Sequence, residues 1–254
     1  MLKLHLDTDL GGDIDDLCAL AMVLNWPDVE LLAVTTVADD RGRRAGYARY
    51  ALSLAGREDV AVAAGADVSL GRYRSRPGFP DEDAYWPEPI PPAPTPLDEA
   101  LSVLERSIEH GAVIVAIGPY TNLALLEKRR PGILRTATLY LMGGFVFPPR
   151  GGFPPWDHRM DYNVQVDVQS AHDVIQRSSP TLVPLSVTVE TWLRRAYLAT
   201  LRRSGPLARL IARQADAFAK DENIEAQYGR TCQGLPDDTI NFLHDPLACA
   251  IALG

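Results

Sequence analysis

The chain has 254 residues, of which 46% are hydrophobic and 23% charged, and it contains three scattered cysteines. This composition is typical of one globular α/β domain, and so few cysteines exclude a disulfide scaffold or a zinc ribbon. The net charge of −8 argues against nucleic acid as a partner, because phosphates attract lysine and arginine. Met1 leads straight into a predicted strand and no long apolar run follows, so we expect no secretion, no membrane segment and a cytoplasmic location.

The first predicted unit is a strand, an acidic turn and a helix. Leu2, Leu4 and Leu6 predict the strand, and the apolar run from Leu17 to Leu24 predicts a buried helix. Between them stand five acidic residues, Asp7, Asp9, Asp13, Asp15 and Asp16, with two glycines. One or two of these acids could cap the helix, but five carboxylates in one turn repel each other strongly. The turn therefore predicts a site for a hard cation such as Ca²⁺ or Mg²⁺.

The same alternation of strand and helix continues along the chain. Val29–Val37 predicts a second buried strand, Arg41–Ala55 a helix and Val60–Ala64 a short strand. A strand, a helix and a strand within about 35 residues form a βαβ unit, which implies a parallel sheet.

Residues 65–96 interrupt this alternation with eight prolines. We expect no regular element at that proline density, and a functional flap or loop within the same domain. Its aromatic residues, Tyr73, Tyr85 and Trp86, would either stack on a nucleobase or pin the loop to the protein.

The second half of the chain completes an open, mostly parallel, doubly wound and Rossmann-like sheet with helices on both faces, in a single domain over residues 1–254. We expect residues 186–244 to be mainly helical. The other predicted elements are helices over Leu97–His110, Val168–Arg177, Glu190–Phe218 and Leu247–Leu253, and strands over Ala112–Ile117, Thr136–Met142 and Thr181–Leu185.

Two other known patterns also contain closely spaced acids. An EF-hand loop that starts at Asp7 would need ligands at Gly11 and Cys18, so it is excluded. A phosphatase of the haloacid dehalogenase type, with Asp7 as its nucleophile, fits less well because Gly11 stands where a threonine or valine is usual. It stays an alternative.

The motifs together resemble one family. They are LHLDTDLGGDIDDLCAL (residues 4–20), TTVADD (35–40), GPYTNLA (118–124), LMGG (141–144), DYN…VD (161–167) and LHDPLA (243–248). Their order and spacing resemble the nucleoside hydrolases, the inosine-uridine-preferring N-ribohydrolases, and particularly members with the long DTDxGxDxDD turn. The resemblance implies the nucleoside hydrolase type of sheet and hydrolysis of the N-glycosidic bond of a ribonucleoside or a similar compound. It also implies a homodimer or homotetramer.

The resemblance implies a Ca²⁺ site held by Asp9, Asp16, Asp245 and the main-chain carbonyl of Thr121, an all-oxygen shell. The ribose 2′- and 3′-hydroxyls and one water would fill the remaining positions. Asp15 would take a proton from the attacking water, with Asp13 as a reserve candidate and Asp7 as support.

The resemblance also assigns the sugar and base contacts. Asp40, Asp161 and Asn163 would hydrogen-bond the sugar hydroxyls. His244 would either protonate the leaving base or position Asp245. Tyr228 and Trp192 would wall the base site or, more commonly for aromatic residues, belong to the core.

The chain departs from the family pattern in four respects. The asparagine that the family usually carries a few residues before Asp161 is missing from the loop at residues 154–157. Asp40 stands where asparagine is common, Asp161 stands where glutamate is common, and most members continue beyond LHDPLA for longer than this chain. These departures motivate an alternative from another functional class, a catalytically weak or inactive homologue that binds ribose or a nucleoside.

Overall fold

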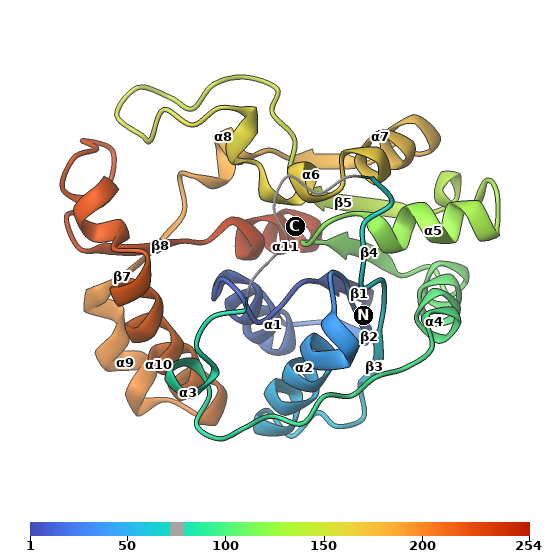
Figure 1. The fold of residues 1–254 in the computed structure, drawn as a ribbon, viewed down its shortest axis with the longest axis horizontal. Helices are drawn as coiled ribbons and strands as arrows, with labels where there is room; N and C mark the ends of the chain where they lie inside the picture. The colour runs from blue at the N-terminus through green and yellow to red at the C-terminus, as the bar shows by residue number, and fades with distance from the viewer. Residues whose placement is uncertain (72–78) are drawn as a thin grey trace.

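The structure, a computed structural model, describes residues 1–71 and 79–254. Six parallel strands form the central sheet in the order β3-β2-β1-β4-β5-β6 (Figure 1). The strands are β1 (Leu2–Thr8), β2 (Val29–Thr36), β3 (Ala61–Ala64), β4 (Val113–Ala116), β5 (Thr138–Met142) and β6 (Thr181–Val183). From β1 the chain adds β2 and β3 on one side and then β4, β5 and β6 on the other. The junction between β1 and β4 is therefore the topological switch point, where open α/β sheets bind their ligands.

Helices cover both faces of this sheet, which confirms the predicted fold class (Figure 1). Along β4, Val115 belongs to one hydrophobic core and Ile114 to the other, because successive strand residues point to opposite faces. The first face carries α1 (Asp15–Asn25), α2 (Arg43–Leu54) and α11 (His244–Leu253), and the second carries α4 (Leu97–Glu109), α5 (Thr121–Arg129) and α7 (Val168–Arg177).

A flanking layer extends the first core. It contains α9 (Leu198–Arg203), α10 (Pro206–Asp221) and a two-stranded sheet of β7 (Trp192–Arg194) and β8 (Thr239–Phe242). The prediction of helix throughout Glu190–Phe218 is therefore wrong at its start. Trp192 pairs with Phe242 in antiparallel register, so a partner distant in sequence supplies backbone hydrogen bonds that local patterning does not reveal.

The described part of the proline-rich segment, residues 65–71 and 79–96, holds one regular element, contrary to the prediction. A one-turn helix, α3 (Glu82–Tyr85), fits between Pro80 and Pro87, and the Asp81 carboxylate caps it by accepting from the Asp83 amide at 3.2 Å. Trp86 pins the segment because its ring stacks on Tyr47 with 4.2 Å between centroids. Tyr73 lies outside the described residues.

Several predicted boundaries move by a few residues. β5 begins at Thr138 because Ile133–Arg135 forms a short 3-10 helix, and β6 ends before Pro184. α11 begins at His244, three residues before the predicted start. The remaining short elements are α6 (Tyr162–Val166), α8 (Leu185–Thr188), a π-helical turn (Glu225–Gly229) and 3-10 turns at Asp40–Gly42, His158–Met160 and Arg195–Tyr197. Among the described helices, none has the length and apolar character to cross a bilayer.

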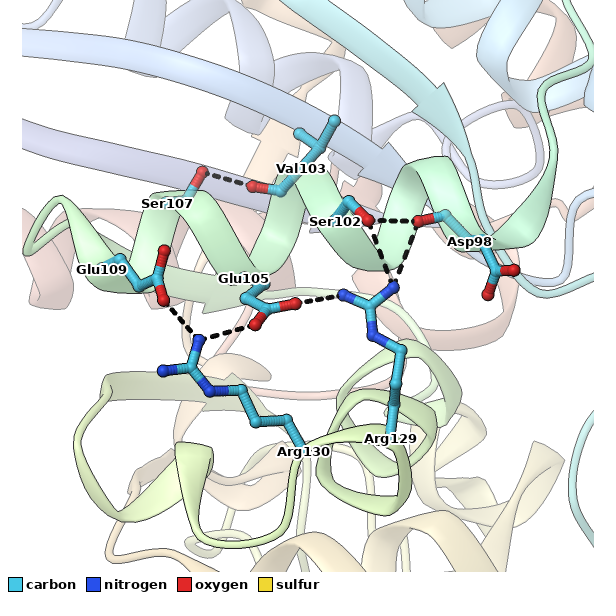
Figure 2. A network of polar contacts seen from close by, with 8 residues as sticks. All are labelled: Asp98, Ser102, Val103, Glu105, Ser107, Glu109, Arg129 and Arg130. Atoms are coloured by element: carbon cyan, nitrogen blue, oxygen red, sulfur yellow. Dashed lines mark hydrogen bonds and ion pairs between the residues drawn. The ribbon is translucent and has the colours of Figure 1, made fainter.

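Figure 2 shows how α4 is tied to its neighbours. On its outer side Glu105 forms an ion pair with Arg129, the last residue of α5. Glu105 forms a second ion pair, at 2.6 Å, with Arg130, which follows α5. Further along α4, Ser107 lies 2.8 Å from the Nδ1 of His5 in β1, while His5 Nε2 lies 2.9 Å from the Thr35 hydroxyl. α4 thus contributes both to an exposed ion-pair cluster and to the buried hydrogen bonds of Ser107, His5 and Thr35.

The buried His5 is expected to make the protein sensitive to acid. Burial lowers the pKa of His5 from 6.5 to about 3, so the unfolded chain gains this proton first as the pH falls. Stability from neutral His5 is complete above pH 6.5 and is lost as the pH falls toward 3. When the pH falls from 7 to 5, the unfolding free energy of the wild type should drop by about 2 kcal/mol more than that of His5→Gln, because only the wild type carries this histidine. Urea unfolding of both proteins at the two pH values measures the difference. Equal losses in the two proteins would contradict this.

Candidate active site

A cavity of about 700 Å³ opens at the switch point between β1 and β4. Its floor comes from the turn after β1 and from the start of α11, and its outer walls come from α3, α10 and β8. Its lining includes Asp9, Asp13, Asp15, Asp16, Arg44, Tyr85, Met142, Trp156, Asn163, Phe218, Asp221, Glu222, Asn241, Phe242, His244 and Asp245. The volume is within the range of small-molecule sites.

Three carboxylates from opposite ends of the chain meet on the cavity floor. Oxygens of Asp15, Asp16 and Asp245 lie within 4.8 Å of one another, and all three residues are buried. The Asp245 amide also points to the Asp15 carboxylate, at 3.4 Å. The extended β1 delivers the first two at the start of α1, and β8 delivers the third at the start of α11. The pairing of α1 with α11 holds the two ends together.

This cluster fits a divalent cation. Among the described residues, no lysine or arginine forms an ion pair with its three members. Burial, with repulsion from Asp13 and Asp16, raises the pKa of Asp15 well above its usual range. Burial and repulsion from Asp15 do the same to the pKa of Asp245. A hard cation would relieve both penalties, because it takes several carboxylate oxygens at once.

Arg44 is the buried cation nearest to this floor. Its guanidinium donates to three main-chain carbonyls, those of Ala38 at 2.9 Å, Leu10 at 3.2 Å and Asp9. It therefore fixes the backbone of the acidic turn, and its charge opposes the rise that burial causes in the pKa of Asp9.

The residues beneath the floor form a fixed polar layer. Thr8 donates a hydrogen bond to Asp16, and Asp7 accepts from Thr35 at 2.5 Å and from Asn122 at 2.7 Å. Burial raises the pKa of Asp7 to about 7, and one of its oxygens has no hydrogen-bond partner. Asp7 is fully buried and lies outside the cavity lining, so it is not placed as a nucleophile for a phosphate ester.

Comparison with known proteins identifies the family. The family model for the inosine-uridine preferring nucleoside hydrolases matches residues 4–254. The chain belongs to the inosine-uridine preferring nucleoside hydrolase family. Its reaction is the hydrolysis of the N-glycosidic bond of ribonucleosides, and such enzymes depend on a metal ion.

Named relatives agree with this assignment. A pyrimidine-specific ribonucleoside hydrolase, RihA, of Klebsiella pneumoniae is 30% identical over 99% of this chain and 78% of its own length. RihA of an Enterobacter species is 31% identical with the same coverage. Among solved structures, a purine-preferring ribonucleoside hydrolase from Gardnerella vaginalis matches with a TM-score of 0.77 and 25% identity, over 99% of this chain and 79% of that one. A plant nucleoside hydrolase shares the fold with a TM-score of 0.78 and 24% identity, over 99% and 78% of the two chains.

The nucleoside hydrolase cavity contains most of the residues predicted for the site. Asp9, Asp13, Asp15, Asp16, Asn163, His244 and Asp245 all line it. The Nδ1 of His244 lies 2.7 Å from the Thr188 hydroxyl, and burial lowers the pKa of His244 to about 4. At neutral pH its ring is therefore uncharged, and both predicted roles of His244 stay predictions.

Three predicted site residues lie outside the cavity lining. Thr121 is buried at the start of α5, where its hydroxyl donates to Asp167 at 2.7 Å. Asp40 is exposed, whereas its neighbour Asp39 is buried and accepts from Thr36 at 2.6 Å. Asp161 accepts from the amides of Gly144 and Val164. Carbonyl ligation by Thr121 and the sugar contacts of Asp40 and Asp161 stay predictions.

Asp161 is expected to stabilise the fold as a helix cap. Its carboxylate caps α6 through the Val164 amide at 3.2 Å and holds the Gly144 amide at 2.5 Å. Asp161→Ala should lower the unfolding free energy by about 1 kcal/mol or more, because buried amides lose their acceptor. Asp161→Asn is the matched control, since an asparagine side chain can still cap. If urea unfolding gives the alanine and asparagine variants the same unfolding free energy, the capping role of Asp161 is contradicted.

The aromatic predictions divide in the same way. Tyr85 lines the cavity, whereas Trp192 and Tyr228 pack against the main hydrophobic core and are absent from the described lining. Trp156, which was assigned no role, lines the cavity and donates to the Tyr228 hydroxyl at 3.2 Å.

Sequence reasoning also missed other lining residues, among them Arg44, Phe218, Asp221, Glu222 and Asn241. Arg44 sits in an arginine-rich stretch that reads as a solvated helix face, and Asp221 and Glu222 end a long amphipathic helix. Only Asn241 carried a usable signal, because a polar residue in an apolar strand next to LHDPLA is unusual.

Proposed function

We propose that this chain is a Ca²⁺-dependent ribonucleoside hydrolase and that Asp9, Asp16, Asp245 and the Thr121 carbonyl hold the ion. The convergence of Asp15 and Asp16 with Asp245 on the floor of one cavity is the observation that carries the proposal. Oxygen-only donors favour Ca²⁺ over softer metals. When bound, the ion would lower the pKa of a water and bind vicinal sugar hydroxyls.

The chain's own residues would supply the remaining chemistry. Asp15, whose pKa burial raises, takes the proton of the attacking water. The Asn163 amide nitrogen donates to the carbonyls of Ile117 at 2.8 Å and Met142 at 3.1 Å. This leaves its amide oxygen to accept from a sugar hydroxyl. The surrounding carboxylates suit the positive charge that develops on the ribose as the glycosidic bond breaks.

The base end of the cavity would be apolar on one side. Trp156 and Phe242 contact each other with ring centroids 4.9 Å apart, and Phe242 stacks against His244 at 5.7 Å. Such a wall can hold a planar base by stacking. His244, neutral at pH 7, would act on the leaving base as a hydrogen-bonding group and would not carry a full positive charge.

Release of ribose from a panel of pyrimidine and purine nucleosides tests this proposal, because the named relatives include enzymes of both kinds. The assay compares protein stripped by a chelator with the same protein after addition of Ca²⁺ or Mg²⁺. We expect ribose release only with the divalent ion and more of it with Ca²⁺. Nucleoside binding without ribose release under every condition would instead support an inactive binding homologue, and full activity in chelator would overturn the metal assignment.

A further inference from the structure

The cavity lining carries a second group of acids besides Asp15, Asp16 and Asp245. Asp13 precedes α1, Asp221 ends α10 and Glu222 follows it, and all three line the cavity. Tyr85 of α3 joins them, because its hydroxyl donates to Asp221 at 2.9 Å. Burial and the carboxylates of Asp221, Asp13 and Glu222, in that order, raise the pKa of Tyr85. We refer to these three acids and Tyr85 as the acidic wall of the cavity.

The charge on the described lining is strongly one-sided. Its carboxylates belong to Asp9, Asp13, Asp15, Asp16, Asp221, Glu222 and Asp245, and its one arginine or lysine is Arg44. A divalent ion on the floor and Arg44 would together supply three positive charges against these seven. Among the ion pairs of residues 1–71 and 79–254, none includes Asp13, Asp221 or Glu222. Negative charge therefore exceeds positive charge on the described lining.

Aromatic rings border the same acids. Phe218 of α10, Trp156 and Phe242 line the cavity together with Tyr85, and Trp156 and Phe242 contact each other with ring centroids 4.9 Å apart. Phe79 also lines it, but its ring already holds the guanidinium groups of Arg43 and Arg44 at 4.5 and 4.7 Å. A ring face attracts a cation, and a carboxylate attracts the same cation over a longer range. Rings and unpaired carboxylates on one wall are thus complementary to a flat group that carries positive charge.

We propose that this wall selects ribosides whose leaving group is a cation, such as N-alkylated purine or pyridinium ribosides. The inference rests on the proposed hydrolysis. As the C1′–N bond breaks, its electron pair goes to the ring nitrogen, so the positive charge of the ring is cancelled and a neutral base departs. Water adds to C1′ and gives its proton to Asp15. No group has to protonate the leaving base.

The wall should act on binding more than on the chemical step. The carboxylates attract the positive charge when it is on the ring in the ground state, and they attract the same charge when it moves to the neighbouring sugar as the bond breaks. An interaction of similar strength in both states changes KM and leaves kcat unchanged, whereas one made only in the transition state changes kcat. Removing the acids should therefore raise the KM of a cationic substrate and leave its kcat nearly constant.

The test compares nicotinamide riboside, a pyridinium cation, with neutral uridine. In the double variant Asp221→Asn/Glu222→Gln, the ratio of kcat/KM for nicotinamide riboside to that for uridine should fall about tenfold, mainly through KM, since two exposed charges at the cavity are removed. The control variant Glu99→Gln removes an exposed charge from α4, outside the cavity lining, and should keep the wild-type ratio. The wild-type ratio should also fall as salt rises from about 0.02 M to about 0.5 M, because salt screens the attraction.

The outcomes separate this inference from the proposed function. Hydrolysis of uridine with a ratio that neither the double variant nor salt changes would overturn the cation preference and leave the hydrolase intact. If neither substrate is hydrolysed, calorimetric binding of the two ribosides decides. If the double variant binds nicotinamide riboside about tenfold more weakly than the wild type does, the cation-selective wall is supported and the hydrolase proposal fails. Equal binding to both proteins would remove both.

Discussion

Asp245→Asn is expected to reduce ribose release by roughly a thousandfold, because a bound metal supplies several kcal/mol of transition-state stabilisation. Asp245 lines the cavity floor with oxygens within 4.8 Å of those of Asp15 and Asp16, so its loss breaks the proposed cation site. Added Ca²⁺ should then no longer raise the unfolding temperature. Without metal, the variant should unfold at the wild-type temperature or above it, since one member of a repelling buried group is gone.

Thermal unfolding and a ribose assay, each with and without Ca²⁺, measure both effects. Asp237→Asn is the matched control, because Asp237 is exposed and lies outside the described lining. Wild-type activity in Asp245→Asn would remove this residue from the site. A metal-free variant much less stable than the wild type would show that Asp245 has a structural role that these contacts do not explain.

Asp15→Asn is expected to lower kcat by about a hundredfold to ten-thousandfold, the range for loss of a general base. The asparagine keeps the shape of the side chain, and its amide cannot take the proton of water. If Asp15 is the base and not a ligand, the variant should still be stabilised by Ca²⁺. The decisive comparison is kcat against the Ca²⁺-induced shift in unfolding temperature.

The structure gives this comparison particular weight. Asp15 lies within the same close group as Asp16 and Asp245, so its carboxylate is also near enough to contact the ion. A loss of both Ca²⁺ stabilisation and activity would make Asp15 a ligand. Asp13→Asn is the parallel variant, because Asp13 is the reserve candidate and is anchored by Asn241 at 2.6 Å. A large kcat loss only in Asp13→Asn would transfer the base role to Asp13.

The sheet and most helices were predictable because their signals are local. Apolar runs such as Ala112–Ile117 gave β4, and the spacing of apolar residues gave α4 and α7 within one residue of their observed ends. β7 escaped because its pairing with β8 joins residues far apart in the chain. α3 escaped because a one-turn helix has no periodicity to detect.

The site divides along similar lines. The density of acids in the first turn predicts a cation site, and the resemblance to the nucleoside hydrolases assigns Asp9, Asp16 and Asp245 to it. Which of two adjacent aspartates is buried depends on a register of one residue that the sequence does not reveal: Asp39 is buried and Asp40 is exposed. The sugar contact of Asp40 stays a prediction. Arg44 and Glu222 reach the cavity only through the packing of α2 and α10, which no local pattern encodes.

The pairing of α11 with α1 has a consequence for biosynthesis. Asp15 and Asp16 leave the ribosome early, whereas Asp245 is synthesised some 230 residues later. A nascent chain therefore carries an open, incomplete acidic pocket during most of its translation. Nascent chains that lack α11 should not hydrolyse nucleosides, so catalytic competence would report that both ends of this fold have come together.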